Sequence, residues 1–295
     1  MATPKIIRNR IKSIHELYDR LRGGKASLLT MIDEAEIPES VYNSNAIENS
    51  TLTLKETEHI LLDMEVARRV DVREVFEAKN LARVNDYIRS QIDTLHVSKD
   101  IILLLHQLLM SGIHDAVAGR FRRPGEYVRV GTHVAPAPEK VEQLIDDTLV
   151  EYGSNLETYD LDKIAKFHLD FETIHPFNDG NGRIGRALLN LQLNRLGFPN
   201  IIIREKEKRA YYRAFGEYRD TQNTKPMERI VTLALLESLH KRVTYLKGET
   251  IITLADYAKK HRTSVNALLN AARRQSIPAF REKGIWKIGT EFRSK

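Results

Sequence analysis

Apolar residues recur at spacings of three and four along most of residues 8–245. The pattern is clearest in three segments, 72–91, 98–111 and 160–174. Side chains at this spacing share one face of an α-helix, which buries that face against its neighbours. The pattern therefore predicts an all-α fold, a bundle of helices, for most of the chain.

Two segments carry signals for the ends of helices. Thr53 and Glu56 form the pattern of a capping box, which predicts a helix that begins there and ends near Asp63. Residues 182–196 continue the helical pattern, and Gly197 follows them as a C-terminal stop.

Residues 126–136 depart from the helical pattern. Polar and apolar residues alternate over 126–130, Gly131-Thr132 is a turn, and a second short run ends at Pro136. Alternation around a two-residue turn is typical of a β-hairpin, and we expect a helix after it, to about Tyr152. The basic run 120–123 before the hairpin is interpreted as a solvated surface.

The last 45 residues differ from the rest of the chain. Two short helices are predicted at 253–260 and 265–274, followed by two strands that meet at Lys283-Gly284, the order of a winged helix-turn-helix. This segment carries a net charge of +7. The whole chain carries +6, so the charges of the first 250 residues sum to −1. We therefore predict two domains, 1–248 and 249–295.

The basic residues of the second domain include Arg262, Arg273, Arg274, Arg281, Lys283 and Lys287. Basic charge on such a module favours contact with a DNA backbone. The alternative is a protein-binding module that selects a target, because basic winged helices also dock proteins.

Composition narrows the chemistry. The chain has no cysteine, which excludes disulfides, thiolate metal sites, iron–sulfur clusters and a cysteine nucleophile. The N-terminal residues lack the apolar stretch of a signal peptide, and the longest aliphatic run, 101–105, is too short to cross a bilayer. We expect a cytoplasmic protein without a membrane partner.

The segment 175–186, HPFNDGNGRIGR, carries the most chemical information. It contains GxGxxG, and Glu205 follows at the distance expected for a dinucleotide-binding fold. That fold requires a buried strand before the glycines, whereas residues 160–174 have helical periodicity. A plain interhelical turn is the other simple interpretation, but a turn needs neither the histidine before it nor the two arginines after it.

The third interpretation is an anion site at the start of a helix. Successive backbone N–H groups around two glycines can converge on a phosphate, with the helix dipole behind them. Arg183 and Arg186 are three residues apart, so both project from one helix face and can hold phosphate oxygens. Asp179 is a hard oxygen ligand suited to Mg²⁺. His175, whose ordinary pKa lies near neutrality, can take a proton from an attacking hydroxyl.

The segment resembles the signature of the Fic family, HxFx(D/E)GNGRxxR. Every fixed position is present, and the matching residues are His175, Phe177, Asp179, Gly180, Asn181, Gly182, Arg183 and Arg186. The resemblance covers roughly residues 40–245. It implies an all-α Fic bundle with a β-hairpin flap and transfer of AMP from ATP to a Ser, Thr or Tyr hydroxyl of a protein.

The same resemblance implies a role for each residue. His175 would be the general base, Asp179 the Mg²⁺ ligand and Gly180-Asn181-Gly182 the anion nest. Arg183 and Arg186 would orient the β- and γ-phosphates of ATP, and Phe177 would anchor the loop in the core. Asp179 and Gly182 differ from the phosphate-transferring Doc branch, whose motif resembles HxFxxANKR.

An inhibitory element is also suggested by resemblance. Ser44, Glu48 and Asn49 match the family's inhibitory motif, (S/T)xxxE(G/N). A carboxylate on a neighbouring helix could pair with Arg186 and keep ATP from binding productively. In some members the same glutamate supports removal of AMP, and the sequence leaves that alternative open.

Other contacts follow from the resemblance. The hairpin 126–136 resembles the flap that holds an extended target segment. Tyr211 and Tyr212 resemble a pair lining the adenine pocket, although two helical tyrosines can equally belong to the core. Arg219 stands where some relatives have an asparagine, so the nucleotide donor is open. A homodimer is a further alternative, and the rival function is a DNA-binding regulator whose Fic site senses a nucleotide.

Overall fold

The computed structural model describes residues 3–66 and 69–293. Contacts divide the chain into two compact units: 37–197 with 202–228, and 3–36 with 198–201 and the residues from 229 onward. The predicted domains 1–248 and 249–295 stay a prediction. The contacts group α1 (Lys5–Arg22) and most of α10 (Lys225–Lys247) with the C-terminal elements.

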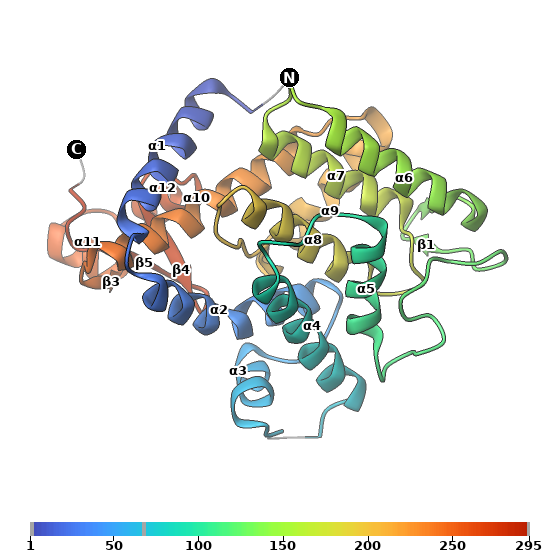
Figure 1. The fold of residues 1–295 in the computed structure, drawn as a ribbon. Helices are drawn as coiled ribbons and strands as arrows, with labels where there is room; N and C mark the ends of the chain where they lie inside the picture. Colours follow the sequence, from blue (N-terminus) through green and yellow to red (C-terminus); the bar gives the residue numbers. More distant parts are fainter. Residues whose placement is uncertain (1–2, 67–68, 294–295) are drawn as a thin grey trace. The chain divides into compact units, whose positions relative to one another are not determined.

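The first unit is a helical bundle with one hairpin (Figure 1). Its elements, after the second half of α2 (Ala26–Ile47), are α3 (Leu54–Glu58), a π-turn (His59–Asp63), α4 (Val72–Ser90), α5 (Lys99–Met110), β1 (Arg129–Val130), β2 (His133–Val134), α6 (Pro138–Ser154), α7 (Asp160–Ile174), α8 (Asn181–Arg195), a 3₁₀ turn (Glu205–Glu207) and α9 (Lys208–Thr221). The predicted fold class, a Fic-type helical bundle with a short hairpin, is confirmed.

Local sequence signals explain where several helices begin. The predicted capping box is present: Thr53 Oγ1 accepts from the N–H of Glu56 at 3.3 Å, and Glu56 Oε2 accepts from the N–H of Thr53 at 2.8 Å. The side chain of Ser98 caps α5 in the same way. Each cap satisfies N–H groups that have no partner within their own helix.

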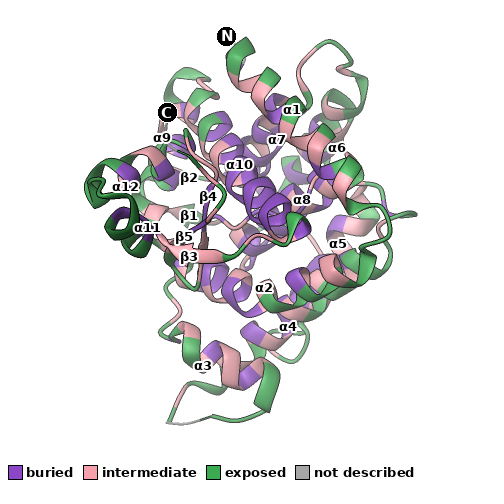
Figure 2. Ribbon diagram, turned by 90° about the vertical axis from the view of Figure 1, so that its left-hand side faces the viewer, coloured by how far each residue is buried: buried purple, intermediate pink, exposed green. Residues whose placement is uncertain are grey.

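Helices α7 and α8 pack against each other at the centre of the unit. Most residues of α8 are buried (Figure 2, buried residues in purple). Phe171, Phe177, Ile184 and Leu188 are part of one apolar cluster. The apolar positions of α8 lie in this core together with buried polar side chains such as Arg186 and Gln192, and this burial fixes the loop between α7 and α8.

The hairpin is shorter than predicted, with two residues in each strand. Arg129 pairs with Val134 and Val130 pairs with His133, in antiparallel register. The ring of His133 bonds through Nε2 to the carbonyl of Thr173 at 2.8 Å, which ties the hairpin to the end of α7.

Arg122 is a second tie between the hairpin and α7. Its guanidinium is buried and donates to the carbonyls of Ile174, His175, Glu126 and Pro136 at 2.8 to 3.3 Å. The solvated surface expected for residues 120–123 is therefore wrong at this position: only Arg123 is exposed. The carbonyls that bind the Arg122 guanidinium come from separate segments of the chain, so the sequence alone does not show that this arginine is buried.

The second unit contains α1, the first half of α2, most of α10 and a small α/β module. The module consists of β3 (Ile251–Thr253), α11 (Leu254–His261), α12 (Val265–Arg273), β4 (Ala279–Glu282) and β5 (Ile285–Gly289). The strands form an antiparallel sheet in the order β3-β5-β4. Both helices and the hairpin were expected, whereas β3 was not, because its three residues are too few for a visible alternation.

Arg242 on α10 is the main buried charge of the second unit. Its guanidinium donates to Asp33 at 2.5 Å and to Glu36 at 2.7 Å, and only 1% of the side chain is exposed.

Among the residues that the structure describes, no helix is long and apolar enough to span a membrane.

Replacement of Arg122 tests how the hairpin is held. Arg122→Met removes a charged donor from four carbonyls, so we expect the free energy of unfolding to fall by about 2 to 4 kcal/mol. Urea denaturation measures the change. Arg123→Met, an exposed neighbour, is the control with an expected change below about 0.5 kcal/mol. Equal effects at the two positions would contradict the assignment.

Candidate active site

The loop between α7 and α8 presents the predicted motif. His175 ends α7 with φ 51°, and Gly180 precedes α8 with φ 83°. The second value is a left-handed conformation that glycine adopts without strain. Helix α8 begins at Asn181, so the N–H groups of its first turn lack partners within the helix and point out of its N-terminus.

Asn181 closes this loop through its side chain. Its Oδ1 accepts from the N–H of Phe177 at 2.9 Å, and its Nδ2 donates to the carbonyl of Phe177 at 2.8 Å. The amide is therefore used inside the loop, and only the backbone N–H of Asn181 is available to an anion. The resemblance assigned this residue to the anion nest, which stays a prediction; in the structure its side chain closes the loop at Phe177.

The imidazole of His175 is partly enclosed by the protein. Its Nδ1 is buried and has no hydrogen-bond partner, while its carbonyl accepts from Arg122 Nε at 2.9 Å. Burial lowers the pKa of His175 to about 4, below the near-neutral value expected from the sequence. The imidazole is therefore neutral at neutral pH, which is the form that accepts a proton.

Arg186 is held by the segment predicted to inhibit it. Its Nε donates to Ser44 Oγ, and its Nη2 donates to the carbonyl of Ser44, both at 2.9 Å. The same Nη2 forms an ion pair with Glu48 Oε1 at 2.8 Å. Nη1 of Arg186 is buried without a partner, so the guanidinium keeps one donor for another ligand.

Glu48 also covers the start of α8. A Cβ built on Gly182 would lie 2.1 Å from Glu48 Oε1, so a larger residue at this position would displace the carboxylate. The carboxylate thus lies over the first turn of α8, where unpaired N–H groups attract negative charge. Asn49 accepts from Lys208 Nζ through Oδ1 at 2.7 Å, which fixes the end of this segment.

Arg183 does not share the surroundings of Arg186. Only 3% of its side chain is exposed, and it pairs with Glu77 on α4 and with Asp179, each at 3.0 Å. Asp179 in turn accepts from Arg73, also on α4. Burial raises the pKa of Asp179, but Arg183 and Arg73 outweigh it and hold the carboxyl ionised.

Arg73 and Glu77 were missed in the sequence. Their spacing of four on one helix is an ordinary surface pattern. Only the packing of α4 beside the loop of α8 brings them to the motif.

Comparison with known proteins identifies the fold and the motif. The Fic/DOC family model matches residues 96–193, a range that contains the whole motif. A protein adenylyltransferase Fic from Nematostella vectensis is 33% identical over 210 residues, which are 68% of this chain and 48% of the relative.

Solved structures agree. A Fic-domain signaling protein from Bacteroides thetaiotaomicron superposes with a TM-score of 0.74 at 22% identity, over 81% of this chain and 97% of that one. Fic-1 from C. elegans has a TM-score of 0.68 at 26% identity, over 82% and 72%.

The chain belongs to the Fic/DOC family. It spans less than half the length of the curated relatives it matches.

The tyrosine pair of the Fic domain lies behind Arg186. Tyr211 is 1% exposed and its hydroxyl bonds to His168 Nε2 at 2.6 Å. The Arg186 guanidinium lies 5.9 Å from the centre of the Tyr211 ring. Tyr212 is 37% exposed and donates to the carbonyl of Ile47 at 3.2 Å. Both tyrosines thus support the arginine and the inhibitory segment; a role toward adenine stays a prediction.

His106 was not predicted, although it supports the loop. It stacks on Phe177 with ring centres 3.6 Å apart, and Phe177 itself is fully buried. Gly119 N–H donates to His106 Nδ1, which leaves the proton on Nε2 to bond the carbonyl of Asp179; both distances are 3.1 Å. The Fic loop is therefore anchored from α5 at both Phe177 and Asp179.

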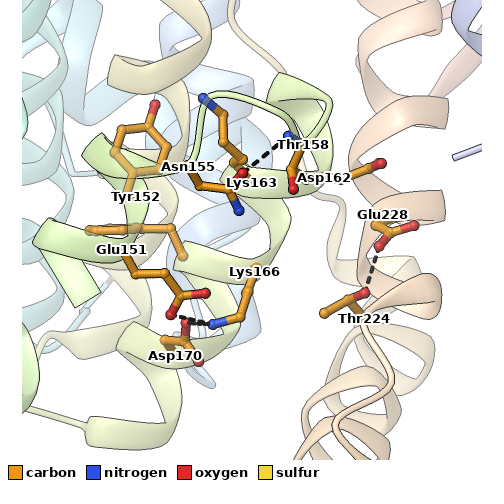
Figure 3. A pocket seen from close by; sticks show the side chains of 11 residues that line it. Glu151, Tyr152, Asn155, Thr158, Asp162, Lys163, Lys166, Asp170, Thr224 and Glu228 are labelled. Carbon is orange, nitrogen blue, oxygen red and sulfur yellow. Dashed lines mark hydrogen bonds and ion pairs between the residues drawn. The ribbon is translucent and has the colours of Figure 1, made fainter. Parts of the chain in front are cut away.

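A separate cavity of about 260 Å³ lies between α6, α7 and the start of α10 (Figure 3). Lys166 bridges Glu151 and Asp170 there, at 2.8 Å to each. The residues of the Fic motif do not line it, so the predicted chemistry does not belong to this cavity.

Glu172 is a partly buried acid on α7, missed in the sequence because a single glutamate in a helix is usually solvated. Its Oε1 has no hydrogen-bond partner. Burial and the nearby charge of Glu48 raise the pKa of Glu172 to about 8. The site therefore contains an uncharged carboxylic acid at neutral pH.

This raised pKa makes stability depend on pH. The carboxyl would ionise near pH 4.5 in the unfolded chain but near 8 in the folded one, so its stabilising contribution is lost as pH rises through that window. We expect wild type to lose about 2 to 4 kcal/mol relative to Glu172→Gln between pH 5 and pH 8.5. Urea unfolding at both pH values measures the difference.

The matched control is Glu157→Gln, which changes an exposed glutamate. Its stability should follow the wild-type pH profile. Identical profiles for Glu172→Gln and wild type would show that Glu172 is ionised in the folded protein.

Proposed function

We propose that this protein is an adenylyltransferase that moves AMP from ATP to a Ser, Thr or Tyr hydroxyl of a target protein. The observation that carries the proposal is a partly buried His175, neutral because burial lowers its pKa to about 4, in the loop that leads into the N-terminus of α8, with Arg186 beside the same turn. Curated relatives at 31% to 33% identity are named protein adenylyltransferase Fic, which supports the same reaction.

The reaction balances on groups in this loop. The target hydroxyl oxygen forms a bond to the α-phosphorus of ATP while the bond from that phosphorus to the bridging oxygen breaks and pyrophosphate leaves. His175 takes the hydroxyl proton. The N–H groups of Asn181 and Gly182 would hold the phosphate oxygens, a position where the helix dipole favours negative charge. The N–H of Gly180 donates to Asp179 in this structure, so it would join them once Asp179 moves.

The two arginines are proposed to hold the β- and γ-phosphates. Nη1 of Arg186 has no hydrogen-bond partner in the structure, and Nη2 gains one free N–H if Glu48 withdraws. Arg183 is already engaged by two carboxylates, so its contribution requires Glu77 or Asp179 to move.

Asp179 is the proposed Mg²⁺ ligand, and the residues fit such an ion. Mg²⁺ binds through one or two carboxylates together with phosphates and water, and Asp179 borders a cavity of about 550 Å³. Within 3–66 and 69–293, no cluster of three or more His, Asp or Glu side chains could hold a metal alone. When bound, Mg²⁺ would neutralise phosphate charge.

Glu48 is proposed to inhibit the reaction by holding Arg186. The pair is partly buried, since 7% of the arginine side chain and 34% of the glutamate side chain are exposed. A triphosphate would have to displace Glu48 both from the arginine and from the first turn of α8. Removal of AMP with the help of Glu48 stays an alternative for the same site.

The hairpin is proposed to dock the target protein. Tyr127 and Val134 are 64% and 65% exposed at its edge. Exposed apolar side chains beside a two-stranded edge suit an extended target segment that pairs main chain to main chain.

The C-terminal module supports DNA contact less than its charge suggested. Arg281 pairs with Glu237 at 2.6 Å, and Lys287 pairs with Glu282 at 2.7 Å. Two of the ten basic residues in 251–295 are therefore paired with carboxylates of the second unit. DNA binding, a nucleotide-sensing regulator, another nucleotide donor and a homodimer stay alternatives, and the enzyme is our conclusion.

The inhibitory contact can be tested through self-modification. Glu48→Gly frees Arg186, so we expect incorporation of AMP from labelled ATP to rise at least about tenfold over wild type. Intact-mass spectrometry counts adenylyl groups per chain. Glu48→Gly with His175→Ala should show none, because the base is gone.

Glu48→Gln serves as the matched variant, since it keeps the side chain's size and removes its charge. It should also be activated, although less than the glycine variant. No increase in either variant would contradict inhibition by Glu48.

A further inference from the structure

The Asp179 carboxylate is fully engaged in this structure. Its Oδ1 accepts from the N–H of Gly180 at 2.5 Å and from Arg183 Nη2 at 3.0 Å. Its Oδ2 accepts from Arg73 Nη2. An incoming cation therefore meets a guanidinium on each oxygen of its proposed ligand.

The two arginines differ in how firmly they are held. Arg183 is almost fully buried between Asp179 and Glu77. The side chain of Arg73 is 52% exposed and lies in the first turn of α4. Among the described residues its other ion-pair partner is Glu77, at 3.1 Å from its Nε. Arg73 is thus the partner that can leave Asp179 without opening the core.

The space next to Arg73 can accommodate its side chain after it leaves Asp179. It lines the cavity of about 550 Å³ that contains Asp179, Arg183 and Glu48. A guanidinium that leaves Oδ2 can keep its contact with Glu77 and still face this space, where the phosphates of a bound nucleotide would lie. Arginine suits such an exchange, since its fork pairs equally well with carboxylate and phosphate.

We propose that Arg73 is a positioning residue that competes with the divalent cation for Asp179 and must swing away before the cation binds. The inference rests on the proposed function for its cation site. Two positive charges cannot share Oδ2, because a guanidinium a few ångströms from a divalent ion repels it. The carboxylate is thereby kept ionised and oriented until the cation arrives with the nucleotide.

Titration with Mn²⁺ tests the competition without any reaction. Free Mn²⁺ is counted by its electron paramagnetic resonance signal in the full-length Glu48→Gly protein with a non-hydrolysable ATP analogue. The test variant carries Arg73→Gln in addition to Glu48→Gly. This substitution removes the charge of Arg73 but keeps most of its bulk, so Mn²⁺ should bind about three- to tenfold more tightly than to the Glu48→Gly protein.

A matched control lies on the same helix. Arg89 is also an exposed arginine in an ion pair, with Asp86 at 3.0 Å, near the other end of α4. Arg89→Gln should leave the Mn²⁺ affinity unchanged. Thermal unfolding of each variant without Mn²⁺ shows whether the fold is retained.

Asp179→Asn separates the two claims. If this variant loses Mn²⁺ binding but Arg73→Gln binds as tightly as its parent, the cation site stands and the competition by Arg73 is wrong. If Mn²⁺ binds equally well to Asp179→Asn, or to none of the proteins, the proposed cation site fails and the competition fails with it.

Discussion

In the proposed reaction, the carboxylate of Glu48 and the triphosphate of ATP would compete for one guanidinium, that of Arg186 near the start of α8. Glu48 reaches Arg186 at 2.8 Å and lies against Gly182, on the turn whose N–H groups are free to bind an anion. The Glu48 carboxylate thus occupies the position, and carries the sign of charge, that a bound phosphate would have. In the proposed inhibition, its attraction to Arg186 and to the helix dipole holds the site, and a nucleotide with more negative charge would replace it.

The same principle extends along the loop. Asp179, Arg183, Arg73 and Glu77 form a chain of ion pairs on the side facing α4. Behind the loop, the ionisable groups are instead kept neutral: burial lowers the pKa of His175 to about 4 and raises that of Glu172 to about 8. The ion pairs of the loop thus lie on the side facing α4, and the neutral imidazole of His175 is the form that accepts a proton.

Local patterns in the sequence predicted much of this arrangement. The helix 160–174 coincides with α7, because its apolar stripe and the loop after it leave few alternatives. The resemblance at Ser44 and Glu48 led to the contact with Arg186 found here. Arg122, Arg73 and Glu77 could not be found this way, since their partners lie far along the chain and only packing brings them together. His106 likewise looked like one more residue of an apolar helix.

The central claim is that Arg186 changes partners from Glu48 to a phosphate. A crystal structure of the Glu48→Gly protein with a non-hydrolysable ATP analogue and Mg²⁺ tests it most directly. The account predicts the Arg186 guanidinium on the terminal phosphates and the α-phosphorus within reach of His175. A triphosphate bound away from the first turn of α8, with Arg186 still held only by Ser44, would contradict it.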